Sequence, residues 1–259
     1  MTIAIMQPYI FPYIGYFQLV HASDVFVFYD DVNFINRGWI NRNRILLNGA
    51  EHMLTVPCKD ASQNKLIMDI AVTDDAKAIP KLINTVKMAY AKAPYFADVF
   101  PLIEHTLSLA AQLPVTDTQP STAFPSLDIQ LAHTAAPLSI ADMAIHSVIT
   151  ICNYLGIKRE FRLSSQSYDN RELKKADRLI DICLRENIVH YVNAAGGKAI
   201  YDKEYYGAKG VKLDFMNAKL VEYSQFNNTF VPWLSIIDIL MFNSKEDIVN
   251  KILPSYYLD

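Results

Sequence analysis

Two adjacent aspartates are the residues of this sequence best suited to acid–base chemistry. Asp30 and Asp31 directly follow an apolar run, so they end a predicted strand. Carboxylates at that place suit a sugar hydroxyl, a metal or an amine, and a carboxylate within reach of an amine can accept its proton. His21, at the end of a predicted helix, is the third candidate. We therefore predict Asp30, Asp31 and His21 as catalytic residues, with surface ion pairs as the alternative for the aspartates.

Basic residues gather just after the aspartates, although the whole chain has a net charge of −3. Residues 33–65 carry five basic and two acidic side chains. Arginine forks fit the oxygens of phosphate or carboxylate, and an indole can cover a sugar or base. We expect Arg42 above all to point into a pocket. The predicted substrate-binding residues of this segment are Arg37, Trp39, Asn41, Arg42, Arg44 and Lys65.

Three further turns follow predicted strands, and parallel strands bind ligands at their carboxyl ends. The first leads into a helix whose free N–H groups favour an anion. The second holds two serine hydroxyls, and the third holds a Gly-Gly pair followed by a lysine. Each suits a phosphate, although capping, tight turns and hydrophobic packing are the alternatives. The binding candidates are Gln7, Tyr9, Tyr13, Ser164, Ser165, Gly196, Gly197 and Lys198.

Composition disfavours several other classes of protein. The slight negative charge argues against a nucleic-acid binder, and no apolar run reaches the length of a membrane span. Glycine is rare, at 8 of 259 residues, and no phosphate-loop or dinucleotide fingerprint occurs. The histidines and the three cysteines have no metal-ligand spacing, so no metal site is predicted. With no secretion signal, we expect a cytoplasmic protein; a homo-oligomer stays open.

The pattern of apolar residues predicts strands at both ends of the chain and helices in the middle. Predicted strands span 2–6, 24–29, 52–56, 67–72, 160–163, 189–193 and 211–216. Predicted helices span 13–22, 80–90, 96–107, 139–155, 169–183, 236–242 and 245–253. Serine caps are expected at Ser139, Ser235 and Ser244.

This alternation predicts an α/β fold with a mainly parallel, Rossmann-like sheet. Residues 1–75 and 156–259 form the predicted α/β core. Residues 76–155 form a mainly helical insertion, and within it a loop rich in Pro, Ser and Thr spans 112–137.

Five segments together resemble the WbqC-like family across essentially the whole chain. They read MQPYIFPYIGYFQLVHASDVFVFYDDVNFINRGWINRNRIL, VPCKDASQNKLI, AYAKAPYF, YVNAAGGKAIYDKEYY and FVPWLSIIDILMFNS. Members of that family are encoded among genes for O-antigen and other surface polysaccharides. The resemblance therefore implies a role in building or decorating sugars at the level of nucleotide-sugars.

A second resemblance concerns the fold. The order strand, Pro-rich turn, Gly15, helix, strand resembles the start of the nucleotidyltransferase-like HUP fold, which includes pantoate–β-alanine ligase. There a histidine motif and a later Ser- or Lys-containing loop hold ATP phosphates. Ser164 and Ser165 match that loop, whereas Tyr13 and Tyr16 stand where histidines belong, so ATP stays open as a cofactor.

Together these features predict a transferase or amide-forming ligase of polysaccharide biosynthesis. The substrate would be a nucleotide-linked amino sugar, and the partner an activated acyl or amino-acid donor such as glycine. An aspartate or His21 would remove the amine proton, and the serines or Arg42 would stabilise the developing charge. The alternatives are a nucleotidyltransferase, a glycosyltransferase, and a non-enzymatic binding protein of a polysaccharide assembly complex.

Overall fold

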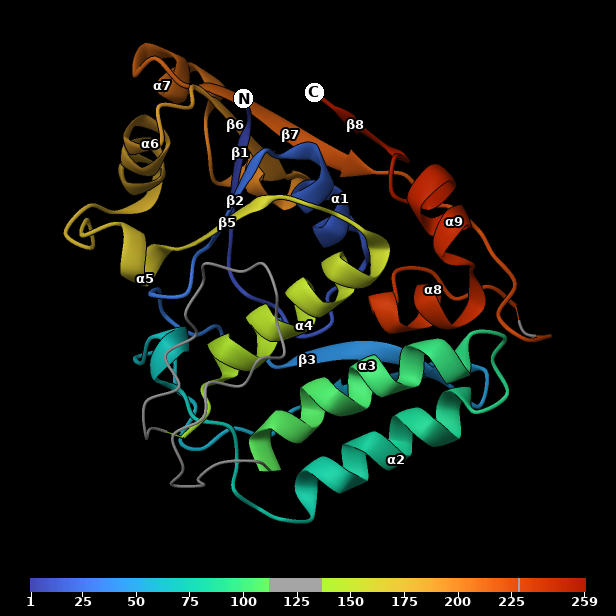
Figure 1. Ribbon diagram of the computed structural model, residues 1–259. Helices are drawn as coiled ribbons and strands as arrows, with labels where there is room; N and C mark the ends of the chain where they lie inside the picture. The colour runs from blue at the N-terminus through green and yellow to red at the C-terminus, as the bar shows by residue number, and fades with distance from the viewer. Residues whose placement is uncertain (112–136, 228) are drawn as a thin grey trace.

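A mainly parallel sheet of six strands organises the protein, together with a two-stranded antiparallel hairpin and helices (Figure 1). The computed structural model describes residues 1–111, 137–227 and 229–259. The α/β class expected from the sequence is thereby confirmed, while nearly all of the predicted loop 112–137 lies outside the described residues. The sheet has the order β5-β2-β1-β6-β7-β8. Its strands are β1 (Ile3–Met6), β2 (Val25–Phe28), β5 (Glu160–Leu163), β6 (His190–Ala194), β7 (Lys212–Ala218) and β8 (Tyr256–Leu258).

The central strands run parallel and end at the same edge of the sheet. Met6 pairs with Phe28, and Phe28 pairs with Leu163, so β1, β2 and β5 finish side by side. Only β8 runs antiparallel, against β7. Both faces of these strands are apolar because helices cover both sides.

Each face of the sheet has its own hydrophobic cluster. Ile3, Ile5 and Val27 pack with α6 (Lys175–Arg185) and α7 (Lys203–Ala208). Alternate residues, including Ala4 and Phe26, pack into a larger cluster on the other face. The period of two along each strand assigns successive side chains to opposite faces.

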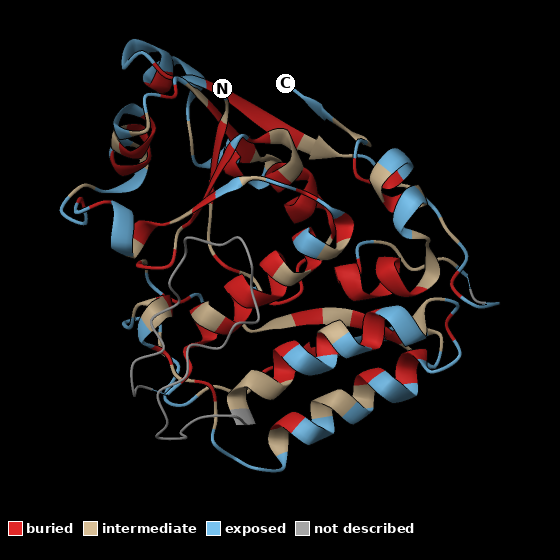
Figure 2. Ribbon diagram, in the orientation of Figure 1, coloured by how far each residue is buried: buried red, intermediate tan, exposed pale blue. Residues whose placement is uncertain are grey.

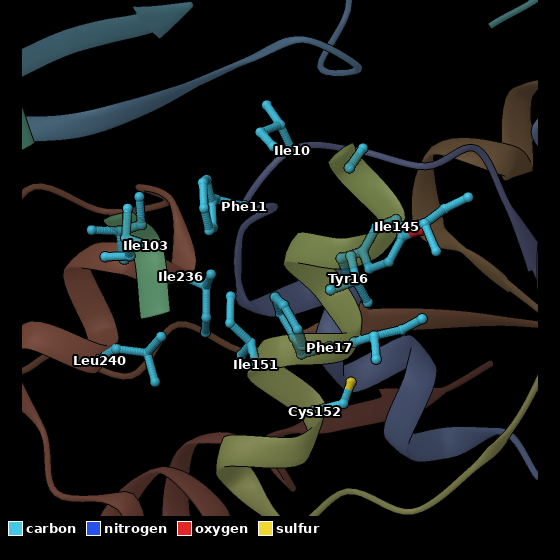
Figure 3. Packing of buried hydrophobic residues seen from close by; sticks show 14 of the residues in the cluster. Ile10, Phe11, Tyr16, Phe17, Ile103, Ile145, Ile151, Cys152, Ile236 and Leu240 are labelled. Atoms are coloured by element: carbon cyan, nitrogen blue, oxygen red, sulfur yellow. The ribbon is translucent and has the colours of Figure 1, made fainter. Parts of the chain in front are cut away.

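The larger cluster also joins the sheet to the hairpin and to helices that come before and after the hairpin in the chain. Its helices are α1 (Ile14–Ala22), α2 (Ala78–Tyr90), α3 (Phe96–Ser108), α4 (Ile140–Leu155) and α8 (Ile236–Phe242), and its hairpin is β3 (Arg42–Leu47) with β4 (Ala50–Thr55). Figure 2 shows α4 as almost wholly buried, whereas α2 and α3 have one buried and one exposed side. Figure 3 shows Phe11, Tyr16, Ile151 and Ile236 meeting in this cluster. The helical range 76–155 therefore shares its core with the sheet, and the domain boundaries stay a prediction.

Short elements complete the chain. They are η1 (Ile67–Asp69), η2 (Leu109–Ala111), α5 (Ser164–Ser167), η3 (Ala195–Ala199), α9 (Lys245–Asp247) and the π-helical η4 (Ile248–Ile252). The three expected serine caps are confirmed, since Ser139, Ser235 and Ser244 each accept a hydrogen bond from a backbone N–H of the helix that follows. Within the described residues, no helix is long and apolar enough to cross a membrane.

Several element predictions were wrong in detail. Residues 67–72 form a 3-10 turn and isolated bridges instead of a strand. Residues 42–47, where no strand was predicted, form β3, because Asn43 and Ile45 are buried by tertiary packing that no local period signals. Helix α6 begins at Lys175, after the pattern that starts at Asp169, and β8 was not predicted.

Candidate functional site

The two aspartates meet the two serines at the carboxyl edge of the sheet. Ser164 Oγ donates to Asp30 Oδ1 at 2.9 Å and also to Asp31 Oδ1. The backbone N–H of Ser165 donates to Asp30 Oδ1 at 3.0 Å, and its hydroxyl donates to Asp30 Oδ2. This contact follows directly from the register, because β2 and β5 are paired neighbours that end just before these residues. Two predicted candidates from distant parts of the chain are thus brought together.

Asp31 is further paired with two arginines. Arg178 Nη2 lies 2.6 Å from Asp31 Oδ2, and Arg171 Nε lies 3.1 Å from the same oxygen. Arg178 is buried on α6, whereas the side chain of Arg171 is 51% exposed. The guanidinium of Arg178 also stacks on Tyr29, 4.7 Å from the ring centroid. Asn170 Oδ1 accepts from Arg178 Nε at 2.9 Å, which fixes the arginine from behind.

The two acids therefore have different environments. Asp31 faces two cations, while Asp30 accepts from two serine hydroxyls and from the backbone N–H of Ser165. Because Asp30 contacts the partly exposed hydroxyl of Ser165, it is the better placed of the two acids to accept a proton from a substrate. Asp31, which two guanidinium groups hold in place, is suited to orienting Ser164.

The turn after β1 has a strained backbone that other segments hold in place. Phe11 has a φ of 39°, which is rare for a bulky residue. Its carbonyl accepts from Asn43 Nδ2 at 2.9 Å and from Ser235 Oγ at 2.6 Å. Its N–H donates to Ser147 Oγ at 3.0 Å. Strain that is fixed by three separate elements is typical of a functional turn.

The polar side chains of this turn face one another. Tyr16 donates to the Gln7 carbonyl at 3.0 Å, and the Tyr9 hydroxyl lies 3.5 Å from Gln7 Oε1. Burial, together with nearby Tyr13, raises the pKa of Tyr9 to about 12, so Tyr9 stays protonated near neutral pH. The ring of Tyr13 lies so close to Gly15 that a Cβ there would sit 2.5 Å from the ring. Tyr13 therefore covers the first turn of α1.

The arginines of β3 have partners within the protein. Arg42 donates to the carbonyls of Gly38, at 2.9 Å, and Arg37. Arg44 pairs with Glu51 at 2.9 Å. Both guanidinium groups lie over the ring of Trp39, at 6.0 Å for Arg42 and 5.6 Å for Arg44. These contacts offset part of the repulsion between the two like charges, and the binding of an anion by Arg42 stays a prediction.

The remaining candidates are dispersed. Gly197 permits the close approach of Asn193, since a Cβ there would lie 2.6 Å from the Asn193 amide nitrogen. Lys198, on the same η3 turn as Gly196, pairs with Asp259. Asn41 Nδ2 donates to the Val56 carbonyl at 2.9 Å. Arg37 and Lys65 are exposed.

His21 is separated from the aspartates. It lies in the last turn of α1, before the amino end of β2, whereas Asp30 follows the carboxyl end. Burial and nearby Arg159 lower its pKa. The structure therefore does not bring this predicted base to the other catalytic candidates.

The strand order of the sheet reverses between β1 and β6. The chain leaves β1 toward β2 and β5 on one side, and it later adds β6 and β7 on the other. Ligands of open parallel sheets bind where the strand order reverses in this way. Gln7 follows β1 there, and η3 with its glycines follows β6.

Sequence reasoning missed three residues of the aspartate network: Asn170, Arg171 and Arg178. The one available signal was the position of Arg178 beside the apolar residues of α6. The helical period alone does not distinguish a buried arginine at this position from one on the surface. Among the described residues, no group of three or more His, Cys, Asp or Glu side chains could hold a metal ion.

Comparison with known proteins identifies the family. The model of the WbqC-like protein family matches residues 7–119 and 120–250, so the chain belongs to that family. A Mycobacterium tuberculosis protein described as uncharacterized protein Rv1507c is 25% identical over 242 residues, covering 92% of each chain. No solved structure matches.

Proposed function

We propose that this chain is an enzyme of surface-polysaccharide biosynthesis that transfers an acyl or aminoacyl group to the amine of a nucleotide-linked amino sugar. The observation that carries the proposal is Asp30, held at the carboxyl edge of the sheet by the two serines. Its side chain is buried, no described residue forms an ion pair with it, and it follows β2, which lies beside the point where the strand order reverses and such sheets bind ligands. The place of the chain in the WbqC-like family supports a carbohydrate substrate.

The amine would reach Asp30 through the hydroxyl of Ser165. In the reaction the amine nitrogen bonds to the acyl carbon, the bond from that carbon to its leaving group breaks, and the amine loses a proton. The Ser165 hydroxyl is partly exposed and contacts Asp30 Oδ2, so it can pass that proton to the carboxylate. Arg171 pairs with the neighbouring Asp31 and remains half exposed, so it suits the diphosphate of the substrate.

The nucleotidyltransferase-like HUP resemblance bears on the alternative reaction. The strand order suits a mononucleotide-binding fold, which favours a nucleotidyltransferase as the second candidate. ATP phosphates, however, do not fit at the start of α1, because the ring of Tyr13 covers Gly15 there. Tyr16 is buried and donates to the Gln7 carbonyl, so it cannot replace a phosphate-binding histidine. No step through ATP is derived.

Two measurements test the proposal. Thermal unfolding with a panel of nucleotide-sugars should show stabilisation by an amino sugar linked to a nucleotide. Product analysis with activated acyl and aminoacyl donors should then show an amide on that sugar. When a sugar 1-phosphate and a nucleoside triphosphate are supplied instead, release of pyrophosphate with formation of a nucleotide-sugar would support the nucleotidyltransferase. Silence across the whole panel would contradict both and favour a binding protein.

Variants of the aspartate network give the mechanism its own test. Asp30→Asn should lower the transfer rate by about 10²–10⁴-fold, the range for removing a general base. Ser165→Ala should lower it less, because water can replace a hydroxyl relay. Ser167→Ala, an exposed serine on the same short helix, is the matched control and should leave the rate unchanged. If all three variants transfer the group at the rate of the parent, Asp30 is excluded as the base.

A further inference from the structure

A groove beside Trp233 lies outside the aspartate network. It is shallow and partly open to solvent, and Trp233, Tyr223, Phe230 and Lys219 contribute to its lining. Trp233 is 38% exposed although tryptophan is large and apolar. Three aromatic side chains therefore line one shallow site.

The aromatic walls are held rigidly. Trp233 has a φ of 59°, which is an outlier for a bulky residue. Its carbonyl accepts from Arg44 Nη2 at 3.1 Å, and its ring packs edge-on against Tyr13 with centroids 6.2 Å apart. On the opposite wall, the Tyr223 hydroxyl donates to buried Asp238 at 2.7 Å. A rigid aromatic surface loses little conformational entropy when a ligand binds.

The charge and size of the groove restrict its occupant. Among the described residues that line it, Lys219 alone is charged. One lysine is a poor match for a diphosphate, which elsewhere takes several donors or an arginine fork. The groove is shallow, so a single ring lying against its wall fits better than a whole nucleotide-sugar. A flat, uncharged ring with polar edges meets these conditions.

We propose that this groove binds a pyranose ring of an oligosaccharide, stacked on Trp233. The C–H face of a pyranose meets the negative face of the indole, and its hydroxyls reach the solvent and Lys219. The choice of a sugar over other flat rings rests on the proposed function. The groove itself is a second site, on the outer side of the turn that carries Tyr13.

The tryptophan content of the chain makes the test direct. The chain has two tryptophans, Trp39 and Trp233, so the Trp39→Phe variant emits from the groove alone and Trp233→Phe from Trp39 alone. Titration with chitotriose and maltotriose should quench or shift the emission of the parent and of Trp39→Phe. It should leave the emission of Trp233→Phe unchanged. Circular dichroism checks that each variant is folded.

A second change measures the contribution of the groove wall. Adding Phe230→Ala to Trp39→Phe should weaken trisaccharide binding about tenfold, as expected for losing one aromatic contact. Tyr205→Ala on α7, another exposed aromatic, is the matched control and should leave the affinity unchanged.

Several results would overturn the proposal. They are the absence of a response to either trisaccharide in the parent, a response that persists in Trp233→Phe, and an equal response to uridine monophosphate, which would indicate base stacking. A failed nucleotide-sugar panel would remove the proposed function but leave this titration unaffected, so the two failures are distinguishable.

Discussion

Two carboxyl groups in this protein are equally hidden from water and are stabilised by opposite means. The side chain of Asp31 is fully buried and pairs with two guanidinium groups. Asp238 on α8 is also fully buried, but its partners are neutral. The hydroxyls of Tyr90, at 2.9 Å, and Tyr223, at 2.7 Å, donate to it, as does Gln225 Nε2 at 2.6 Å.

The difference between cationic and neutral partners goes with a difference in the place of each acid in the fold. Burial raises the pKa of Asp238, and its three donors offset that rise only in part. Asp238 ties α2, the chain before α8 and, through Tyr90, the N–H of Leu46 on β3 into one unit. Asp31 instead lies at the edge of the sheet where ligands bind, and it pairs there with two cations. Asp238 is a structural link within the larger hydrophobic cluster, and Asp31 is part of the candidate site.

The largest effect is expected from removing the buried cation of Asp31. Arg178→Met leaves a buried carboxylate with only the half-exposed Arg171 beside it. The free energy of unfolding should fall by about 3–5 kcal/mol, the usual loss for breaking a buried ion pair from one side. Urea unfolding of the variant and the parent measures it.

Two further variants sharpen that measurement. Arg171→Met removes a largely exposed partner of the same oxygen and should cost under about 1 kcal/mol. Adding Asp31→Asn to Arg178→Met should recover most of the loss, because no uncompensated charge is left. A double variant as unstable as Arg178→Met would show that the arginine acts by packing on Tyr29.

A smaller loss is expected at Asp238. Asp238→Ala takes an acceptor away from Tyr90, Tyr223 and Gln225, and a buried donor left unsatisfied costs about 1–3 kcal/mol. Because Gln225 Nε2 keeps its bond to the Val231 carbonyl, we expect about 2–3 kcal/mol in total. Calorimetric unfolding at pH 7 measures this loss. A loss of unfolding free energy greater than that of Arg178→Met would contradict the expectation that the ion pair of Asp31 contributes more to stability than the contacts of Asp238.

The sequence predicted the parts of the fold that local patterns specify. Strand 160–163 matches β5 residue for residue, and Ser139 caps α4 as its spacing with Asp142 indicates. The apolar run 24–29 and its neighbour at the N-terminus gave the parallel pair β1 and β2. These features depend on residues close together in the chain, so a single sequence is enough to read them.

The parts that failed depend on contacts between distant residues. Asp30 and Ser165 could both be singled out as polar residues after strands, but their hydrogen bond depends on β5 lying next to β2. Arg178 lies 147 positions from Asp31, and no local pattern pairs them. For the same reason, the partners of Arg42 and Arg44 within the protein could not be foreseen, while their binding of a ligand stays a prediction.

The smallest expected effect is the pH dependence of the free energy of unfolding that comes from Asp238, whose partners are neutral. The pKa of Asp238 is raised in the folded protein from its ordinary value of 3.8, so the folded state binds that proton more tightly than the unfolded chain. The resulting stabilisation is fully present below about pH 4 and is lost as pH rises through the folded pKa. Asp238→Asn cannot titrate, so its stability relative to the parent should improve as pH rises from about 4 toward neutrality. The slope cannot exceed about 1.4 kcal/mol per pH unit for one group.

Tyr90 and Tyr223 do not titrate in this range, because burial raises the pKa of both. Urea unfolding of both proteins between about pH 4 and 7 gives the difference directly, and a difference that stays flat across that range would show that Asp238 is already charged at its lower end.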